Sequence, residues 1–335
     1  MNIIETLAHK AINNNVSDLH ITSAQHPFFR KDGNLIFAAD DILSSREIYE
    51  FVSLILTPEL KTKFIQQREL DFSWKFESRR FRINAYFQRE QPSLAFRLIP
   101  SIIPSLKDIG APAALLKLID ATQGLLLVTG RTGSGKSTTL AAFINAISKA
   151  RACHILTLED PIEFEHISEN CFISQRELGR DFLSFPQALR SALREMPDVL
   201  LVGEIRDCET MAMAMEAAAA GIFVLGTLHT NGAAETAMRV ESMFPIVQRD
   251  AVRDQFADVF RGIFSQQLLP KIGGGRVSAT EVLLSTSASA NLIRQGKYIQ
   301  LSSVILSGKS LGMQTMQAAV QKLVDSHLIA PSNIK

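Results

Sequence analysis

The stretch GRTGSGKS, residues 130–137, decides the fold of this chain, because it fits the pattern G-x-x-x-x-G-K-[ST] of a phosphate-cradling loop. The preceding segment, 124–129, is an apolar run typical of a strand buried on both faces. The following segment, 138–148, carries apolar residues at helical spacing. Strand, glycine loop and helix in this order aim backbone N–H groups and a helix N-terminus at a phosphate chain. The sequence therefore predicts an α/β nucleotide-binding domain.

The positions of this P-loop have separate expected roles. The glycines let the backbone turn tightly around the phosphates, Lys136 reaches the β- and γ-phosphates, and the Ser137 hydroxyl binds Mg²⁺. The residues that we expect to bind the nucleotide in this domain are Arg131, Thr132, Gly133, Ser134, Gly135, Lys136, Ser137 and Thr138.

Composition excludes several other classes of protein. The net charge is +1 and the pI is near 7.8, whereas a nucleic-acid translocase would usually show a basic face, so no nucleic-acid partner is expected. The three cysteines form no CxxC pair, which argues against a zinc knuckle and a disulfide scaffold. The N-terminus lacks a signal-peptide pattern, and the longest apolar run is too short to span a bilayer. These features favour a cytoplasmic protein.

The first hundred residues predict a separate α/β domain. Ser44 and Glu47 have the spacing of a capping box, Pro58 should open a further helix, and Asp32-Gly33 is a turn signal. Three strands are expected in the ranges 71–76, 81–87 and 94–98, because apolar residues alternate along them.

Two arginines lie on the polar face of these predicted strands. Alternation places Arg82 and Arg97 opposite the apolar residues of their strands. A solvated sheet face explains such charges, since antiparallel sheets often have one wet face. The alternative is that the two guanidinium groups contact phosphate, whose oxygens suit their fork of donors.

A proline-containing segment, residues 100–105, is the best linker candidate, because its two prolines disfavour helix. We therefore expect an N-terminal domain over residues 1–99 and a nucleotide-binding domain over residues 106–335.

Two glutamates and a histidine follow further apolar strands. Glu163 closes an acidic segment after the strand at 154–158, Glu204 ends the strand at 197–204, and His229 follows the strand at 222–228. Groups at the carboxyl ends of parallel strands face the ligand crevice of an open sheet. Phosphoryl transfer to water needs a Mg²⁺ partner and a group that orients or deprotonates the water, so we assign these roles to Glu163 and Glu204. His229 would sense the γ-phosphate or orient the water. Helix caps or surface groups are the alternative for the two glutamates, and a satisfied core or surface residue is the alternative for the histidine.

Taken together, the chain resembles the retraction branch of the type II/IV secretion ATPase superfamily, the PilT-like motors of type IV pili. The resemblance rests on five motifs in order: SDLHI at 17–21, the P-loop at 130–137, LTLEDPIEF at 156–164, DVLLVGEIRD at 198–207 and GTLHTN at 226–231.

The resemblance implies a PAS-like N-terminal domain, a RecA-like C-terminal ATPase domain and a homohexameric ring that binds ATP and Mg²⁺. It implies that Glu163 is the water-activating base, that Glu204 supports Mg²⁺ and the water, and that Arg82 and Arg97 reach nucleotide phosphates. The implied partners are an inner-membrane pilus platform protein and the assembly ATPase, at the cytoplasmic face of the inner membrane. The implied function is pilus retraction in twitching motility.

The choice of the retraction branch rests on fewer residues. The short N-terminal region, the missing zinc cysteines and the segment NLIR at 291–294 favour it. We expect 291–294 to couple the shape change of the ring to a partner. Polar residues in place of Leu292 and Ile293 should therefore leave the hexamer folded, spare most ATPase activity and abolish retraction. Ile222 stands where the family usually has a histidine, and Met196 where it usually has an acidic residue. A pilus-assembly or type II secretion ATPase, or a hydrolysis-poor accessory paralogue, therefore remains as the alternative.

Overall fold

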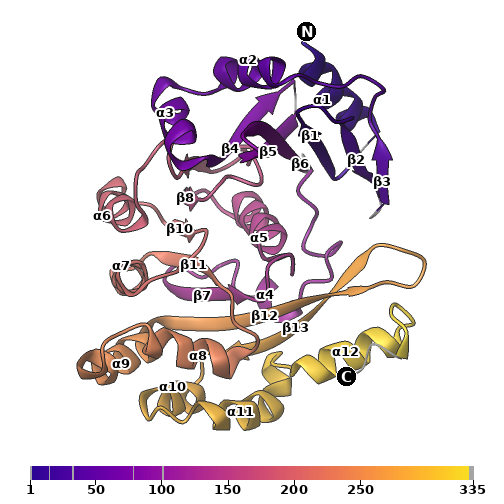
Figure 1. Cartoon of the computed structure of the whole chain (residues 1–335). Helices are drawn as coiled ribbons and strands as arrows, with labels where there is room; N and C mark the ends of the chain where they lie inside the picture. Colours follow the sequence, from indigo (N-terminus) through magenta and orange to yellow (C-terminus); the bar gives the residue numbers. More distant parts are fainter. Residues whose placement is uncertain (1, 15, 32–33, 78, 100–101, 332–335) are drawn as a thin grey trace. The chain divides into compact units, whose positions relative to one another are not determined.

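The structure is a computed structural model and describes residues 2–14, 16–31, 34–77, 79–99 and 102–331. The chain divides into two compact units, Met1–Ile102 and Ile103–Lys335, each drawn in Figure 1. Both units are mixed α/β with one sheet each, so the predicted α/β class is confirmed. The turn expected at Asp32-Gly33 and the first two residues of the expected linker, Pro100 and Ser101, lie outside the described residues.

The first unit is a six-stranded antiparallel sheet with three helices. Its sheet order is β3-β2-β1-β6-β5-β4. The elements are α1 (Ile3–Asn13), β1 (Asp18–Thr22), β2 (Phe28–Lys31), β3 (Asn34–Phe37), α2 (Ser45–Ile55), α3 (Pro58–Gln67), β4 (Glu69–Phe76), β5 (Arg79–Gln88) and β6 (Gln91–Ile99).

Local sequence signals set the helix boundaries in this unit. The Ser44 hydroxyl accepts from the Glu47 backbone N–H, and the Glu47 carboxylate accepts from the Ser44 N–H, which confirms the capping box. Pro58 opens α3, as predicted. Side chains of the helices, including Phe51 and Phe64, form one core with Phe81 and other residues of a single sheet face. The opposite face carries mostly polar side chains, among them Arg82 and Arg97.

The second unit is a seven-stranded sheet in the order β13-β12-β7-β11-β10-β8-β9. All neighbours are parallel except β13, which is antiparallel to β12. The strands are β7 (Gly124–Thr129), β8 (His154–Glu159), β9 (Phe172–Glu177), β10 (Val199–Val202), β11 (Phe223–Leu228), β12 (Phe260–Pro270) and β13 (Arg276–Leu284). The α-helices are α4 (Ala113–Leu116), α5 (Lys136–Ala150), α6 (Phe185–Glu195), α7 (Cys208–Ala219), α8 (Ala233–Ser242), α9 (Arg249–Val259), α10 (Ser287–Arg294), α11 (Leu301–Ser307) and α12 (Met316–Asp325), with 3₁₀ turns at Ile246–Gln248, Tyr298–Gln300 and Gly308–Leu311.

The sheet of the second unit gathers the predicted site at one edge. Strands β7, β10 and β11 are buried along their whole length, which explains their continuous apolar sequences. Because β7, β8, β10 and β11 run parallel, the loops that follow them leave the sheet from the same edge. The P-loop, Glu163, Glu204 and His229 all follow these strands.

The C-terminal helices form a layer against β12 and β13; Figure 1 shows α8 along β12, with α10 below α8 and α9. Ile293 in α10 is fully buried in the core that contains Leu283 and Leu301. The expectation that Ile293 tolerates a polar substitution is therefore wrong, because a polar group there would lose its hydrogen bonds to water. Leu292 is only partly buried against the same core.

One carboxylate accepts hydrogen bonds from the first turns of two helices. Glu281 in β13 accepts from the backbone N–H of Ala233 in α8, 2.8 Å away, and from that of Met316 in α12, 3.3 Å away. Helix N-termini carry unpaired N–H groups and partial positive charge, so a carboxylate between them is favourable. The loop after His229 and the C-terminal helix thus share one anchor.

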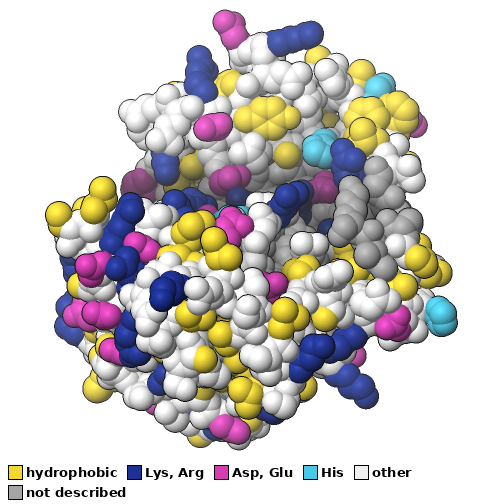
Figure 2. All heavy atoms as spheres, turned by 90° about the horizontal axis from the view of Figure 1, so that it is seen from below, with side chains coloured by type: hydrophobic (Ala, Val, Ile, Leu, Met, Phe, Trp, Pro, Cys, Tyr) yellow, Lys and Arg dark blue, Asp and Glu magenta, His cyan; other side chains and the backbone are white. Residues whose placement is uncertain are grey.

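The surface is mixed in charge. On the face seen in Figure 2, lysine and arginine side chains are interspersed with acidic ones, in line with the net charge of +1. Among the described helices, none has the length and apolar character required to cross a bilayer.

Candidate nucleotide site

The P-loop joins β7 to α5, as the sequence predicts. Gly130 lies at φ +140°, and a Cβ there would lie 2.3 Å from the backbone oxygen of Gln266, so only glycine fits. Gly135 adopts a left-handed conformation immediately before α5, which begins at Lys136. These two positions let the loop close over the first turn of the helix. Arg131, Thr132 and Gly133 are exposed, while Ser137 and Thr138 are half-buried in the first turn.

Lys136 is the buried cation of the site. Its ammonium donates to the backbone oxygens of Gly130, 2.8 Å away, and Arg131, 3.3 Å away. Burial lowers the pKa of Lys136, while the negative charges of Glu204 and Glu163 raise it. Both predicted glutamates therefore lie within electrostatic reach of the P-loop lysine.

Glu204 is held between a histidine and an arginine. One carboxylate oxygen lies 3.2 Å from Nε2 of His229, and the other accepts from Arg206 at 2.8 Å. The hydrogen bond from Arg206 lowers the pKa of Glu204 most, against its partial burial. Nδ1 of His229 lies 3.5 Å from the Thr132 hydroxyl, so the histidine bridges the P-loop and Glu204.

Arg206 is a site residue that the sequence interpretation did not single out. Its guanidinium also lies 3.6 Å from the carboxylate of Asp160, in the acidic segment after β8. It therefore connects the segments after β8 and β10. The sequence could have indicated Arg206 by its position, two residues after Glu204 and just past the end of a strand.

Glu163 is half-buried in the segment after β8, which we call the acidic loop and define as residues 160–166. Immediately before this loop, Oε1 of Glu159 accepts from the Thr157 hydroxyl at 2.7 Å and from the Gln175 amide at 3.1 Å. Although residue 159 is partly exposed, its carboxyl group is enclosed, and this burial raises the pKa of Glu159 to about 7. Sequence patterns did not identify Glu159 as an ionisable group of the site.

The two arginines of the first unit lie directly opposite each other on β5 and β6. Arg82 forms an ion pair with Asp71 at 3.3 Å, and Arg97 forms one with Asp18 at 3.0 Å. The side chain of Arg97 is 72% exposed. Their strands thus present both arginines on the polar face, and contact with phosphate stays a prediction.

Two residues that depart from the family pattern, Ile222 and Met196, lie away from the candidate catalytic groups. Ile222 precedes β11 at the end opposite to His229 and packs in the apolar core. Met196 follows α6 in a left-handed conformation and is exposed.

The residues present fit a nucleotide phosphate chain and Mg²⁺. Besides the buried ammonium of Lys136, the hydroxyl of Ser134 is buried and has no hydrogen-bond partner among the described residues. Ser137 and Glu204 offer the oxygen donors that Mg²⁺ prefers. In the described part of the chain no group of three or more His, Cys, Asp or Glu side chains forms a metal cage, which is usual where Mg²⁺ also binds substrate phosphates.

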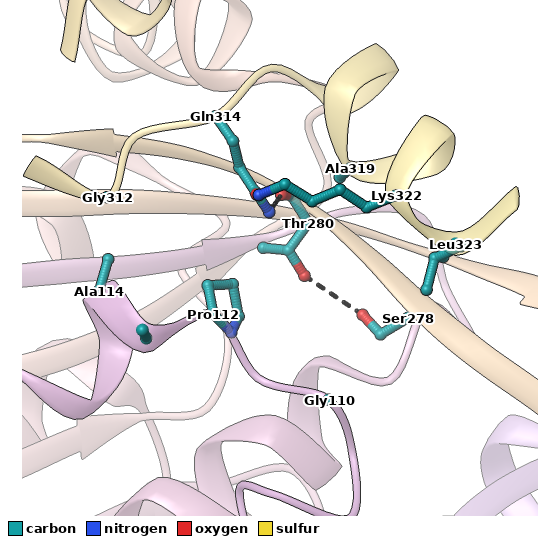
Figure 3. Close-up of a pocket in the computed structure, with 11 residues that line it drawn as sticks. Gly110, Pro112, Ala114, Ser278, Thr280, Gly312, Gln314, Ala319, Lys322 and Leu323 are labelled. Atoms are coloured by element: carbon teal, nitrogen blue, oxygen red, sulfur yellow. Dashed lines mark hydrogen bonds between the residues drawn. The ribbon is translucent and has the colours of Figure 1, made fainter. Parts of the chain in front are cut away.

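A separate cavity of about 300 Å³ lies elsewhere in the second unit (Figure 3). It lies between residues 110–114, β13 and α12, where Lys322 donates to the Gln314 side chain at 2.7 Å. None of the predicted site residues lines it, and the described polar groups beside it are paired with one another, as Figure 3 shows for Ser278 and Thr280. The candidate site is therefore formed by the residues that follow β7, β8, β10 and β11, and not by this cavity.

Comparison with known proteins agrees with this geometry. Residues 1–297 match the family described as "Type II/IV secretion system protein". The chain is 42% identical to the type IV pilus retraction ATPase PilT of Pseudomonas aeruginosa, over 100% of this chain and 97% of the relative. It is 44% identical to a twitching motility protein of Neisseria gonorrhoeae, over 91% of this chain and 82% of the relative.

A solved structure shows the same fold. The crystal structure of the pilus retraction motor PilT with bound ADP matches with a TM-score of 0.91 and 40% identity, over 99% of this chain and 95% of that chain. The chain belongs to the type II/IV secretion system protein family, and within it is similar to PilT over its full length.

Proposed function

We propose that this chain is an ATP-hydrolysing motor that powers retraction of type IV pili, the movement that underlies twitching motility. The observation that carries the proposal is the 42% identity to a retraction ATPase across the whole chain. The assignment of ATP as substrate is supported by the P-loop and by the ADP bound to the similar PilT structure.

In the proposed reaction Lys136 binds the β- and γ-phosphates, and Glu163 takes a proton from the attacking water. Glu204, positioned by Arg206 and His229, orients that water. Mg²⁺, held by Ser137 and Glu204, would neutralise charge on the phosphates when bound. We extend the proposal to Arg82 and Arg97 as further phosphate contacts, because a guanidinium fork matches phosphate oxygens.

The proposal includes a homohexamer as the working form. It also includes an inner-membrane platform protein as partner, the assembly ATPase as a second partner, and a location at the cytoplasmic face of the membrane. These expectations rest on family membership and on the absence of a basic excess, which gives no support to nucleic acid as partner.

The alternatives are a pilus-assembly or type II secretion ATPase and a hydrolysis-poor accessory paralogue. The accessory alternative rests on Ile222 and on the altered C-terminal segment 288–295, with its departures Ser289, Ala290 and Gln295. Because Ile222 packs in the apolar core away from the candidate catalytic groups, it gives no chemical reason for lost hydrolysis.

The enzymatic part is tested by steady-state ATPase activity of the wild type and of Glu163→Gln. The glutamine keeps the shape of the side chain but takes no proton, so the variant should bind ATP and hydrolyse it roughly 10²–10⁴-fold more slowly. A loss below about threefold, far outside that range, would assign the base role to another group.

The direction of work is tested in cells. Deletion of the gene should leave cells with more surface pili and no twitching. Cells bald of pili would instead identify an assembly motor, and unchanged pili would identify an accessory role.

A further inference from the structure

The acidic loop carries the proposed base without regular secondary structure of its own. Residues 160–166 form no helix and no strand between β8 and β9. A base must be held to within a fraction of an ångström for efficient proton transfer. The backbone of this loop therefore needs partners from outside it, because backbone N–H and C=O groups of a half-buried segment have to be paired.

Gln175 on the edge strand β9 supplies two of these backbone hydrogen bonds and a third to the side chain of Glu159, the residue before the loop. Its side-chain oxygen accepts from the His166 backbone N–H at 2.8 Å. Its amide nitrogen donates to the Phe164 backbone oxygen at 2.9 Å and to the Glu159 carboxylate at 3.1 Å. Both amide hydrogens and the carbonyl are thus directed at the acidic loop and the residue before it.

Glu177, two residues further along the same strand, holds the other side of the base. Its carboxylate accepts from the Ile162 backbone N–H at 3.2 Å and forms an ion pair with Arg180 at 3.3 Å. The side chain is only 3% exposed. Residues i and i+2 of a strand point to the same face, so Gln175 and Glu177 act together.

These contacts fall on both sides of residue 163. Glu177 holds residue 162, and Gln175 holds residues 164 and 166. None of the described hydrogen bonds of the Gln175 side chain goes to the P-loop or to Glu204.

From this arrangement we infer that Gln175 and Glu177 are positioning residues for the base Glu163, which they hold through the backbone of the acidic loop. The inference rests on the proposed ATPase function. It separates two properties of the enzyme: nucleotide binding depends on the P-loop, and the rate of the chemical step depends in addition on β9.

The first test compares Gln175→Met with Gln187→Met in the full-length protein. Methionine has a similar length and no amide, so it removes three hydrogen bonds at Gln175 with little change in volume. Gln187 is exposed on α6 and provides the same chemical change away from the site. We expect kcat of Gln175→Met to fall about 10- to 100-fold, as for a misplaced catalytic group, with KM for ATP and ADP affinity within about twofold of the wild type.

Glu177 provides the second pair of variants. Glu177→Gln keeps an acceptor for the Ile162 N–H and should retain kcat within about threefold, whereas Glu177→Leu removes the acceptor and should lose at least about tenfold. This pair decides the question if Gln175→Met fails to fold, which thermal unfolding of each variant will show.

Two results would overturn the inference: folded Gln175→Met and Glu177→Leu with wild-type kcat, or a raised KM with unchanged kcat. Failure of the proposed function looks different, because the wild type and Gln187→Met would then lack ATPase activity as well.

Discussion

Glu159→Gln should change how the stability of the protein depends on pH. The carboxyl of Glu159 has its pKa raised from 4.5 to about 7, chiefly by burial. The folded state therefore holds this proton more tightly than the unfolded chain does, so the stabilisation is fully present below pH 4.5 and is lost as the pH rises to 7. Glutamine does not titrate, and its carbonyl can accept the same bonds from Thr157 and Gln175.

The size of the effect follows from the two pKa values. A gap between 4.5 and about 7 corresponds to about 3 kcal/mol at high pH, of which about 2.5 kcal/mol develops between pH 5 and 8. At roughly 2–4 °C per kcal/mol for a unit of this size, the Tm of Glu159→Gln should gain about 5–10 °C on the wild type over that interval.

The assay is thermal unfolding of both proteins at several pH values. Glu169→Gln, at an exposed position of the same connection, is the control for loss of a negative charge. A Tm difference between Glu159→Gln and wild type that is the same at pH 5 and pH 8 would refute the reasoning, since it would mean that Glu159 ionises freely in the folded protein.

Three further substitutions test other parts of the structure. Lys136→Ala should abolish ATP turnover and weaken nucleotide binding, measured with a fluorescent nucleotide, because it removes the buried ammonium; wild-type turnover would contradict the P-loop assignment. Ile293→Ala should lower the free energy of unfolding by about 2–5 kcal/mol, and an unchanged Tm would show that α10 contributes little to the core. Arg97→Ala should reduce ATPase activity and lower the free energy of unfolding by about 1–3 kcal/mol, since the Asp18 carboxylate that loses its partner is largely buried. Wild-type activity of Arg97→Ala would instead indicate that Arg97 is a charge on a solvated sheet face with no role at the nucleotide.

The elements predicted from sequence are those whose apolar pattern is strong. The strands before the P-loop, Glu204 and His229 are buried on both faces and read as continuous apolar runs. The capping box at Ser44 and the proline at 58 mark helix starts by local chemistry alone. Periodicity and capping therefore locate these elements without tertiary information.

The strands that sequence patterns missed lack such a signal. Strand β9 has the sequence FISQRE and lies at the sheet edge, so its polar residues interrupt any apolar run. Strand β12 contains the buried Gln266, whose amide oxygen accepts from the Thr139 hydroxyl at 3.0 Å, which offsets the cost of burying the amide. The partners of Gln175 lie in the preceding loop and strand, and the partner of Gln266 is 127 residues away in the sequence, so neither set of contacts appears in the pattern of its own strand.

The same limit applies to the site. Strand ends identified Glu163, Glu204 and His229 as candidates, but the approach of Arg206 to Asp160, that of His229 to Glu204 and the enclosed carboxyl of Glu159 depend on three-dimensional contacts. The burial of Ile293 likewise depends on how α10 packs, which a short motif does not specify.

The position of Glu281 has a consequence for how mutational effects combine. Because its single carboxylate serves the first turns of both α8 and α12, the free energies of ordering these two turns are not independent. Groups that share one network typically show interaction energies of about 0.5–3 kcal/mol in double-mutant cycles. Substitutions near Ala233 and near Met316 should therefore be non-additive, although the two residues are far apart in the sequence. Deletion of α12 should then also change the stability of the loop after His229, so the C-terminal helix and that loop form one thermodynamic unit.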